Sequence, residues 1–314
     1  MTKVFVSTEL PGDAVERLRA AGDVTVGTRV GDGAFEAGAD EWDAIVALLT
    51  DRIDEALIAR TPRLRVVANV AVGVDNVDLE ACRSRGVIVT NTPGVLTEAT
   101  ADFAFALLLA AARRVAEGDR LVRRGEFHGW SLGMLLGARV HGTTLGIVGF
   151  GRIGQAVARR ARGFGMHVLY TQRTRLAEPM ARALGATYVD VDELFATSDA
   201  VTLHCPLTPA TRHLVSTERL AQMKPGALLV NTARGACVDE AALAAALASG
   251  RLGGAALDVF EDEPRVNPAL AACERVVLAP HIASADRPTR EAMARIAADN
   301  VLAILADRAP ITPV

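Results

Sequence analysis

The stretch LGIVGFGRIG, residues 145–154, joins a continuous apolar run to a glycine-rich turn. A strand that is buried on both faces of a parallel sheet needs such a run. Gly149 permits a tight turn, Gly151 lets a pyrophosphate approach the backbone, and Gly154 lets a helix pack close to the strand. Free N–H groups at the start of that helix would face the phosphates. The stretch therefore predicts a dinucleotide-binding site.

The residues that follow support this interpretation. Residues 155–164 have the amphipathic pattern of a helix, and a second apolar strand is expected at residues 168–170. A G-x-G-x-x-G pattern alone also occurs in flexible loops, so the strand, helix and strand around it carry the prediction of a nucleotide-binding βαβ unit.

Strands alternate with helices along the rest of the chain, which is typical of α/β domains with parallel, doubly wound sheets. In the first part, strands are expected at 3–7, 43–49, 64–69 and 87–90, and helices at 12–21, 54–60 and 79–85. A single long helix is expected from about residue 98 to 124. Later strands at 200–204, 227–231, 255–258 and 276–278 would complete a six-stranded Rossmann sheet, with helices at 192–196, 217–223 and 240–249.

A last helix, at about 288–306, begins after the second sheet is complete, which predicts a discontinuous first domain. The expected fold class is α/β, with two Rossmann-like, doubly wound parallel-sheet domains. Residues 1–98 plus 286–314 would form a flavodoxin-like, substrate-binding domain, and residues 99–285 a dinucleotide-binding Rossmann domain. Ligands of such sheets bind at the carboxyl ends of the strands, so the active site is expected in the cleft between the domains.

Composition and charge argue against several classes of protein. The chain has 314 residues, of which 50% are hydrophobic, enough for about two domains with substantial cores. Its formal net charge is −3 and its basic residues are scattered, so nucleic acid is not expected as a partner. The longest apolar run, residues 103–112, is about half the length needed to cross a bilayer, and residues 1–10 lack a secretory pattern. A soluble, cytoplasmic protein with no membrane partner is expected.

The four cysteines lie far apart and form neither a C-x-x-C pair nor a metal-ligand spacing: Cys82, Cys205, Cys237 and Cys273. They are most simply interpreted as buried thiols in a reducing compartment. No metal site is predicted.

Three expected strand ends in the second half of the chain carry polar groups. They read NTARG at 231–235, DVFEDEP at 258–264 and PHIAS at 280–284. Arg234 offers a planar fork for a carboxylate, His281 can exchange a proton near neutral pH, and Glu263 can hold that imidazole in its charged form. Taken singly, these could be a surface arginine, a core histidine and a solvated acidic loop. Their arrival together at strand ends favours a catalytic site.

These motifs resemble those of the D-isomer-specific 2-hydroxyacid dehydrogenases, particularly the glyoxylate and hydroxypyruvate reductase branch, over nearly the whole chain. The landmarks are VGVDNVD at 72–78, TEATAD at 97–102, the glycines at 149–154, HCPLT at 204–208 and the three strand-end motifs. The spacing is specific, because Glu263 lies 29 residues after Arg234 and His281 lies 18 residues after Glu263.

The resemblance implies a role for each residue of the expected site. Arg234 would bind the substrate carboxylate and polarise the ketone, His281 would donate the proton, and Glu263 would pair with His281. The backbone of Val72 and Gly73 would bind the other carboxylate oxygen, although Gly73 could otherwise be an ordinary turn glycine.

Cofactor choice depends on the end of the second Rossmann strand. NAD sites place an acidic residue there, roughly 20 residues beyond the glycines, whereas an arginine accommodates the 2′-phosphate of NADP. This chain reads YTQRTR at 170–175 and has no carboxylate there before Glu178. NADPH is therefore expected to be preferred, with NADH possible, and Gln172, Arg173 and Thr174 would surround the phosphate. The alternative is an arginine-rich loop in an arginine-rich protein.

The resemblance also implies the remaining cofactor contacts. Asp258 would bond the nicotinamide carboxamide, and the loop with His204 and Pro206 would form the wall of the adenosine pocket, although His204 could equally be a plain strand-end residue. The full expected set is Gly149, Phe150, Gly151, Arg152, Ile153, Gly154, Gln172, Arg173, Thr174, His204, Pro206, Thr232, Ala233, Arg234, Asp258, His281 and Ala283.

Residues 124–142 are irregular in sequence and correspond to the arm with which related subunits embrace each other, so a homodimer is expected. Trp130 and Met134 would then lie near the partner's active site. Leu132 replaces a proline that is often found there, and Met134 stands where close relatives carry a second tryptophan. Selectivity for the substrate side chain is left open by these departures.

The predicted function is NADPH-dependent reduction of glyoxylate or hydroxypyruvate to the D-2-hydroxy acid by hydride transfer, with His281 as proton donor. By resemblance, Leu49 with its neighbours 48 and 50 would line the pocket mouth and suit a hydrogen or hydroxymethyl substituent at C2. A pocket opened by Met134 could instead accept a bulkier 2-oxo acid. A nucleotide-sensing, corepressor-like scaffold is a second alternative, against which the absence of a long extension after the last expected helix argues.

Overall fold

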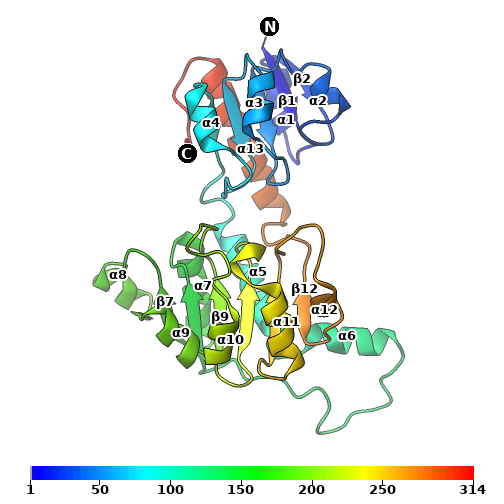
Figure 1. Ribbon diagram of the computed structural model, residues 1–314, viewed down its shortest axis with the longest axis vertical. Coiled ribbons are helices and arrows are strands. Elements are labelled where there is room, and N and C mark those ends of the chain that lie inside the picture. Colours follow the sequence, from blue (N-terminus) through cyan, green and yellow to red (C-terminus); the bar gives the residue numbers. More distant parts are fainter. Residues whose placement is uncertain (1) are drawn as a thin grey trace. The chain divides into compact units, whose positions relative to one another are not determined.

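The computed structural model describes residues 2–314. Contacts within the chain divide it into two compact units (Figure 1). The first runs up to Leu96 and resumes from Ser284 to Val314, and the second is Thr97–Ala283. The boundaries inferred from the sequence lie two residues later in each case, after residues 98 and 285.

A five-stranded parallel sheet forms the centre of the first unit, in the order β2-β1-β3-β4-β5. Its strands are β1 (Lys3–Val6), β2 (Asp23–Val26), β3 (Ala44–Ala47), β4 (Val66–Asn69) and β5 (Ile88–Thr90). Every residue of β3 and β4 is buried, because helices cover both faces of the sheet. Strand β2 is not among the expected strands, because it is an edge strand with no fully buried residue and hence no strong apolar signal.

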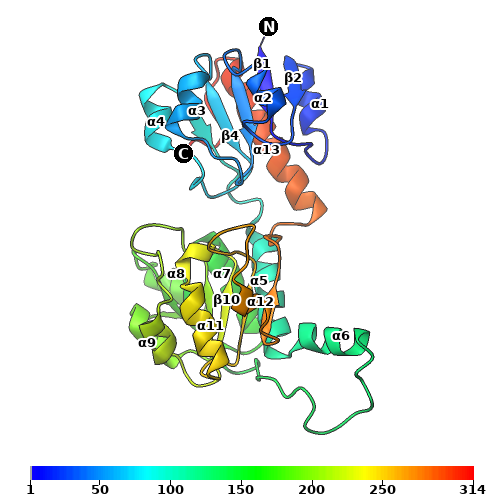
Figure 2. The same ribbon diagram turned by 45° about the vertical axis from the view of Figure 1, so that its right-hand side comes forward.

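Helices cover the two faces of this sheet. They are α1 (Ala14–Arg19), α2 (Gly33–Glu36), α3 (Glu55–Arg60), α4 (Leu79–Ser84) and α13 (Arg287–Leu305). The last helix, α13, packs against α1, β3 and β4, as Figure 2 shows. On the other face, Phe35, Leu57 and Cys82 of α2, α3 and α4 join one hydrophobic cluster with Phe5 and Ile45 of the sheet. The C-terminal helix thus completes the core of the N-terminal domain.

The second unit contains a seven-stranded parallel sheet, in the order β12-β11-β10-β9-β6-β7-β8. Its strands are β6 (Thr144–Val148), β7 (His167–Thr171), β8 (Ala186–Tyr188), β9 (Ala200–Leu203), β10 (Leu228–Asn231), β11 (Gly254–Leu257) and β12 (Val276–Leu278). The expectation of six strands is wrong. The extra strand, β8, is a three-residue edge strand paired with β7, too short to give a periodic signal.

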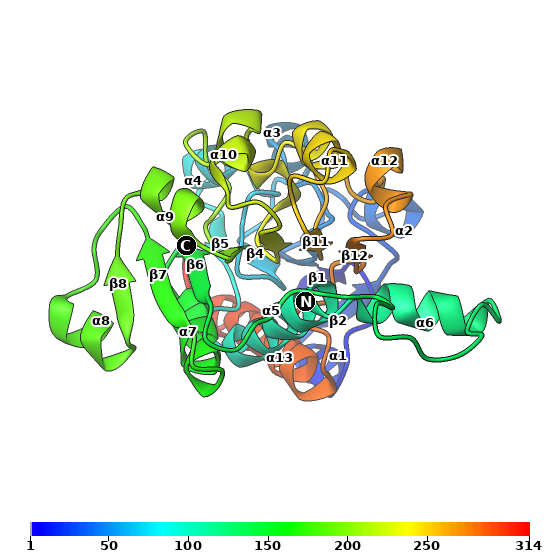
Figure 3. The ribbon, with the colours of Figure 1, turned by 90° about the horizontal axis from the view of Figure 1, so that it is seen from below.

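Helices also flank this sheet on both sides (Figure 3). In chain order they are α5 (Thr97–Ala112), α6 (Val115–Arg123), α7 (Arg152–Gly163), α8 (Glu178–Ala183), α9 (Val191–Thr197), α10 (Thr217–Gln222), α11 (Glu240–Ala248) and α12 (Pro268–Ala271), with the short 3₁₀ helix Gly235–Cys237. Helices α5 and α7 pack together on one face, and α9, α10 and α11 on the other. The predicted α/β class with two parallel, doubly wound sheets is confirmed.

The expected single helix from about residue 98 to 124 is wrong. It divides into α5 and α6, because Arg114 has φ +52°, a left-handed conformation that an α-helix cannot contain. The Arg114 guanidinium bonds Glu117, in the first turn of α6, at 2.6 Å. Helix α5 buries one side in the domain core, whereas α6 has no buried residue. Among residues 2–314, no helix combines the length and apolarity needed to cross a membrane.

Candidate active site

The glycine turn between β6 and α7 is built by close backbone approaches. Gly149 has φ +87°, and a Cβ there would lie 2.6 Å from the backbone of His204 and Cys205. A Cβ at Gly154 would lie 2.2 Å from the Gly149 carbonyl oxygen, so the first turn of α7 packs directly on the strand end. A Cβ at Gly151 would meet nothing within 4 Å. The turn is therefore closed on its protein side and open at Gly151, as a phosphate cradle requires.

Two residues of the turn face inward rather than toward a ligand. The Phe150 side chain is buried and stacks on Tyr170 at a ring distance of 4.1 Å, so only its backbone could touch a cofactor. Ile153 packs against the same hydrophobic cluster. Arg152, the first residue of α7, is exposed. Its side chain and the helix N-terminus are the groups of this turn that can meet an anion.

The loop after β7 carries the expected specificity residues. Gln172 connects this loop to the glycine turn, because its Oε1 accepts from the Phe150 N–H at 3.2 Å and its Nε2 donates to the Thr174 carbonyl at 2.6 Å. Arg173 and Thr174 are exposed, and within residues 2–314 no ion pair is found for Arg173. Arg175, by contrast, lies over the Tyr188 ring, 5.3 Å from its centroid. The loop thus offers a neutral amide and an available cation where an NAD site would offer a carboxylate.

Two buried polar atoms at the carboxyl ends of β9 and β10 have no hydrogen-bond partner within residues 2–314, His204 Nδ1 and Thr232 Oγ1. The other ring nitrogen of His204, Nε2, lies 2.9 Å from Thr202 Oγ1. Burial lowers the pKa of His204 to about 3, so this imidazole is neutral and can bind polar groups without adding charge. Unpartnered buried polar atoms at this edge fit a cofactor that supplies their hydrogen bonds.

His281 and Glu263, from the loops after β12 and β11, form a direct pair. His281 Nδ1 lies 2.9 Å from Glu263 Oε2, and the side chains are 26% and 29% exposed. Glu263 Oε1 accepts from the Phe260 N–H at 3.0 Å, which orients the carboxylate. Burial raises the pKa of the Glu263 carboxyl, but the hydrogen bond and charge of His281, with Arg234 nearby, set the pKa below its usual value. The Glu263 carboxylate is therefore ionised at neutral pH and places a negative charge beside the imidazole ring.

The backbone of His281 is held in an unusual conformation. Its φ is +55°, which is uncommon for a residue with a side chain, and its N–H donates to the Asp258 carbonyl at 2.8 Å. The Asp258 carboxylate in turn accepts from the N–H groups of Ile282, at 2.7 Å, and Ala283, at 2.8 Å. Burial raises the pKa of Asp258, and these two donors lower it in part. Asp258 thus fixes the loop that presents the imidazole.

Arg234 lies at the carboxyl end of β10, within reach of the charge of Glu263. Asn231 holds this strand end, because its Nδ2 donates to the Arg234 carbonyl at 2.9 Å and its Oδ1 accepts from the Ala233 N–H at 3.0 Å. A Cβ at the next residue, Gly235, would lie 1.8 Å from the Phe260 carbonyl carbon. Only glycine lets the Arg234 strand end approach the loop of Glu263 so closely.

A second set of groups, not predicted from the sequence, holds the loop of Glu263 through Glu261. Glu240, a buried acid in the first turn of α11, accepts from the Glu261 N–H at 2.8 Å. The Glu261 carboxylate accepts from Arg212 at 3.0 Å and lies 2.6 Å from His213 Nε2. Nothing in the sequence pattern separates these residues from surface charges. The feature that distinguishes Glu240 is its burial, which only the tertiary structure shows.

The predicted substrate-binding residues Leu49, Val72 and Gly73 belong to the first unit. Leu49 is half-buried in the loop after β3, and Val72 and Gly73 lie in the loop after β4. Asn76 connects the two loops, because its Nδ2 donates to the carbonyls of Leu48, at 3.0 Å, and Asp51, at 2.9 Å. These residues therefore share one edge of the first sheet. Their role in substrate binding stays a prediction.

Two hollows of the second unit lie away from the residues described above. One of about 240 Å³ is lined at the amino ends of β9 and β10 by Asp199, Lys224 and neighbouring residues. Another, of about 570 Å³, lies between α5 and the segment 134–141. Because ligands of doubly wound sheets bind at the carboxyl ends of the strands, neither hollow is assigned to the cofactor.

Comparison with known proteins agrees with this geometry. Residues 105–283 match the D-isomer specific 2-hydroxyacid dehydrogenase, NAD binding domain, family. The chain is 47% identical over 315 residues to a glyoxylate reductase of Thermococcus litoralis, covering 98% of this chain and 95% of that protein. A solved structure of a Thermus thermophilus protein has a TM-score of 0.93 and 47% identity, with full coverage of both chains. An NADPH-dependent glyoxylate/hydroxypyruvate reductase from Sinorhizobium meliloti, solved with NADP and malonate, has a TM-score of 0.89 and 35% identity and covers 100% of this chain and 96% of that one.

The chain belongs to the D-isomer-specific 2-hydroxyacid dehydrogenases, a family of oxidoreductases that bind a nicotinamide cofactor. Within that family it falls in the glyoxylate reductase branch, as the sequence motifs predicted.

Proposed function

We propose that the protein reduces glyoxylate or hydroxypyruvate to the D-2-hydroxy acid, with NADPH as the preferred reductant. The observation that carries the proposal is the pair of His281 Nδ1 and Glu263 Oε2, 2.9 Å apart, in one unit with Arg234. The names of its relatives support the same class of substrate. The free thiols of all four cysteines support a cytoplasmic location.

The proposed reaction divides the work among three side chains. Arg234 binds the substrate carboxylate through its planar guanidinium and draws electron density from the neighbouring ketone. The reduced nicotinamide, when bound, supplies a hydride to C2. His281 Nδ1 faces Glu263, which leaves Nε2 to give its proton to the ketone oxygen. Glu263 stabilises the imidazolium before the transfer and fixes the direction of the ring.

The glycine turn and its surroundings would hold the cofactor. The open side at Gly151 and the start of α7 would bind the pyrophosphate, and His204 and Thr232 would supply hydrogen bonds deeper in the site. Arg173 and Thr174, with the Gln172 amide, would surround the 2′-phosphate. A carboxylate in place of the Gln172 amide would repel that phosphate.

The substrate prediction is that glyoxylate and hydroxypyruvate give the highest kcat/KM, because a small C2 substituent suits the expected pocket at Leu49. Oxidation of NADPH is measured by its ultraviolet absorbance with glyoxylate, hydroxypyruvate, pyruvate and phenylpyruvate. The substrate assignment would be wrong if phenylpyruvate or a branched-chain 2-oxo acid were reduced at least tenfold more efficiently than both small acids. That result would not affect the proposed mechanism.

The cofactor prediction is that kcat/KM with NADPH exceeds that with NADH by roughly tenfold to a hundredfold, the range expected of a charge-assisted hydrogen bond from Arg173. The double change Gln172→Asp with Arg173→Ala should reverse the preference. Arg175→Ala is the matched control, since Arg175 is committed to the Tyr188 ring. Equal or better turnover of the unmodified protein with NADH would refute the assignment.

The proton-donor prediction is that reductive kcat/KM falls as pH rises, because a neutral imidazole has no second proton to give. His281→Ala should lower turnover by ~10²- to 10⁴-fold while NADPH still binds. Glu263→Gln removes the charge that favours the imidazolium and should move the falling limb to lower pH. His167→Ala, an exposed histidine at the start of β7, is the control. Near-normal turnover of His281→Ala would remove this histidine from the mechanism.

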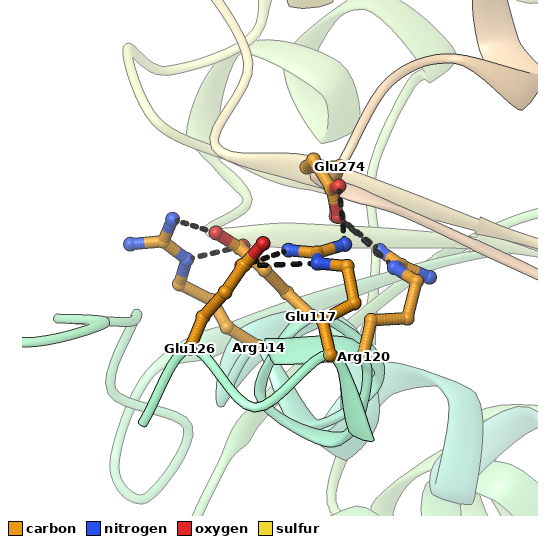
Figure 4. Close-up of polar contacts among 6 residues, drawn as sticks. Arg114, Glu117, Arg120, Glu126 and Glu274 are labelled. Carbon is orange, nitrogen blue, oxygen red and sulfur yellow. Dashed lines mark hydrogen bonds and ion pairs between the residues drawn. The ribbon is translucent and has the colours of Figure 1, made fainter. Parts of the chain in front are cut away.

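We further propose that α6 and residues 124–142 form a homodimer arm. Several apolar side chains there are exposed, among them Phe127, Trp130 at 78%, Leu132 at 82% and Leu136. Arg120 fixes the base of the arm, since its Nε donates to Glu274 Oε2 at 2.9 Å (Figure 4). Arg124 Nη1 also donates to the Glu274 carboxylate, at 3.4 Å.

Sedimentation velocity tests the homodimer. The purified chain should sediment at about twice the monomer mass. The double change Trp130→Ser with Leu132→Ser should shift it toward monomer, because it removes apolar side chains that the dimer would bury. A wild-type chain that stays monomeric at micromolar concentration would contradict the arm's assignment.

A further inference from the structure

The loop after β4 has three consecutive carbonyl groups that are all hydrogen-bonded to the first unit. The Ala71 carbonyl accepts from the Thr92 N–H at 2.9 Å. The Val72 carbonyl accepts from Asn91 Nδ2 at 2.8 Å, and the Gly73 carbonyl accepts from Asn69 Nδ2 at 2.8 Å. Two of the three carbonyls are thus held by asparagine side chains that come from different strand ends, β4 and the loop after β5.

The direction of each carbonyl decides the direction of the next amide. In a planar trans peptide the C=O of one residue and the N–H of the following residue point in opposite directions. The N–H groups of Val72, Gly73 and Val74 therefore point away from Thr92, Asn91 and Asn69. Within residues 2–314 no hydrogen bond is found from any of these three N–H groups, and Val72 is 37% exposed. The loop presents backbone donors that are available to a ligand.

Asn69 and Asn91 are each held in place by further hydrogen bonds. Asn69 is fully buried at the end of β4, where it also exchanges hydrogen bonds with the Asn76 amide. The backbone of Asn91 is fixed by Thr312, which accepts its N–H at 3.2 Å and donates to its carbonyl at 2.6 Å. Removing the Asn91 side chain would therefore release the Val72 carbonyl without detaching the Asn91 backbone.

We propose that Asn69 and Asn91 are positioning residues for an anion site, which hold the carbonyls of Gly73 and Val72 so that the amides of Val74 and Gly73 face a carboxylate. The inference rests on the proposed function for the identity of the anion, the carboxylate of a small 2-oxo acid. The two donors in this proposal are the amides of Gly73 and Val74, whereas the family resemblance implied the backbone of Val72 and Gly73. A carbonyl that accepts a hydrogen bond also strengthens its own peptide N–H as a donor.

The test compares Asn91→Ala with wild type in the reduction of glyoxylate by NADPH. The KM for glyoxylate should rise about tenfold, the effect of misdirecting one hydrogen bond to a charged group. Because the carboxylate is bound equally before and during the reaction, kcat should change little, and the KM for NADPH should stay the same. Asn267→Ala, which removes a side-chain cap of α12 in the other unit, is the control and should leave all three constants unchanged.

A titration without turnover separates this inference from the proposed function. Malonate, a dicarboxylate that cannot be reduced, is titrated calorimetrically into the NADP-loaded wild type, Asn91→Ala and Asn69→Asp, which keeps the acceptor for Asn76 but loses the donor to Gly73. An approximately tenfold weaker malonate affinity in both variants, with unfolding temperatures near that of wild type, supports the inference even if no 2-oxo acid is reduced. Malonate affinity and glyoxylate KM that match wild type in the folded Asn91→Ala variant would overturn it.

Discussion

Close approach between backbones at the carboxyl ends of the strands is the constraint on which the site of the second unit depends. At Gly149 the turn lies against the backbone of His204, and at Gly235 the Arg234 strand end lies against Phe260. A side chain at either position would force the loops apart. The first contact shapes the glycine turn that we propose to hold the pyrophosphate, and the second brings the Arg234 guanidinium to the loop that carries the Glu263 carboxylate. Glycine is the only residue that permits both.

Side-chain amides control the backbone in both units. In the second unit, Asn231 bonds the carbonyl of Arg234 and the N–H of Ala233. In the first, Asn69 and Asn91 bond the carbonyls of Gly73 and Val72. An amide can donate and accept at once, so it satisfies irregular backbone without introducing charge. In both units a neutral side chain therefore fixes the backbone next to the residues proposed to bind a ligand.

Charge in the site is divided between groups that must ionise and groups that must not. Glu263 is ionised because His281 and Arg234 offset the cost of its burial. His204, buried beside Thr202 with no charged partner, is neutral. Both side chains come from strand ends of one sheet, so the difference arises from their surroundings and not from their position in the fold. An ionised carboxylate and a neutral imidazole can thus lie on the same edge of the sheet.

The sequence by itself determined the fold class, the family and the identity of the polar strand ends. Continuous apolar runs, the glycines at 149–154 and the fixed spacing of Arg234, Glu263 and His281 are local patterns, and local patterns survive without coordinates. The sequence did not predict the edge strands β2 and β8 or the helix break at Arg114. Short, half-exposed strands and a single left-handed residue leave no periodic signal. Only the tertiary structure decided that Glu240 is buried under the Glu263 loop and that Asn91 holds the Val72 carbonyl. These contacts join residues 19 to 21 positions apart, and the direction of a hydrogen bond depends on how strands pair rather than on residue order.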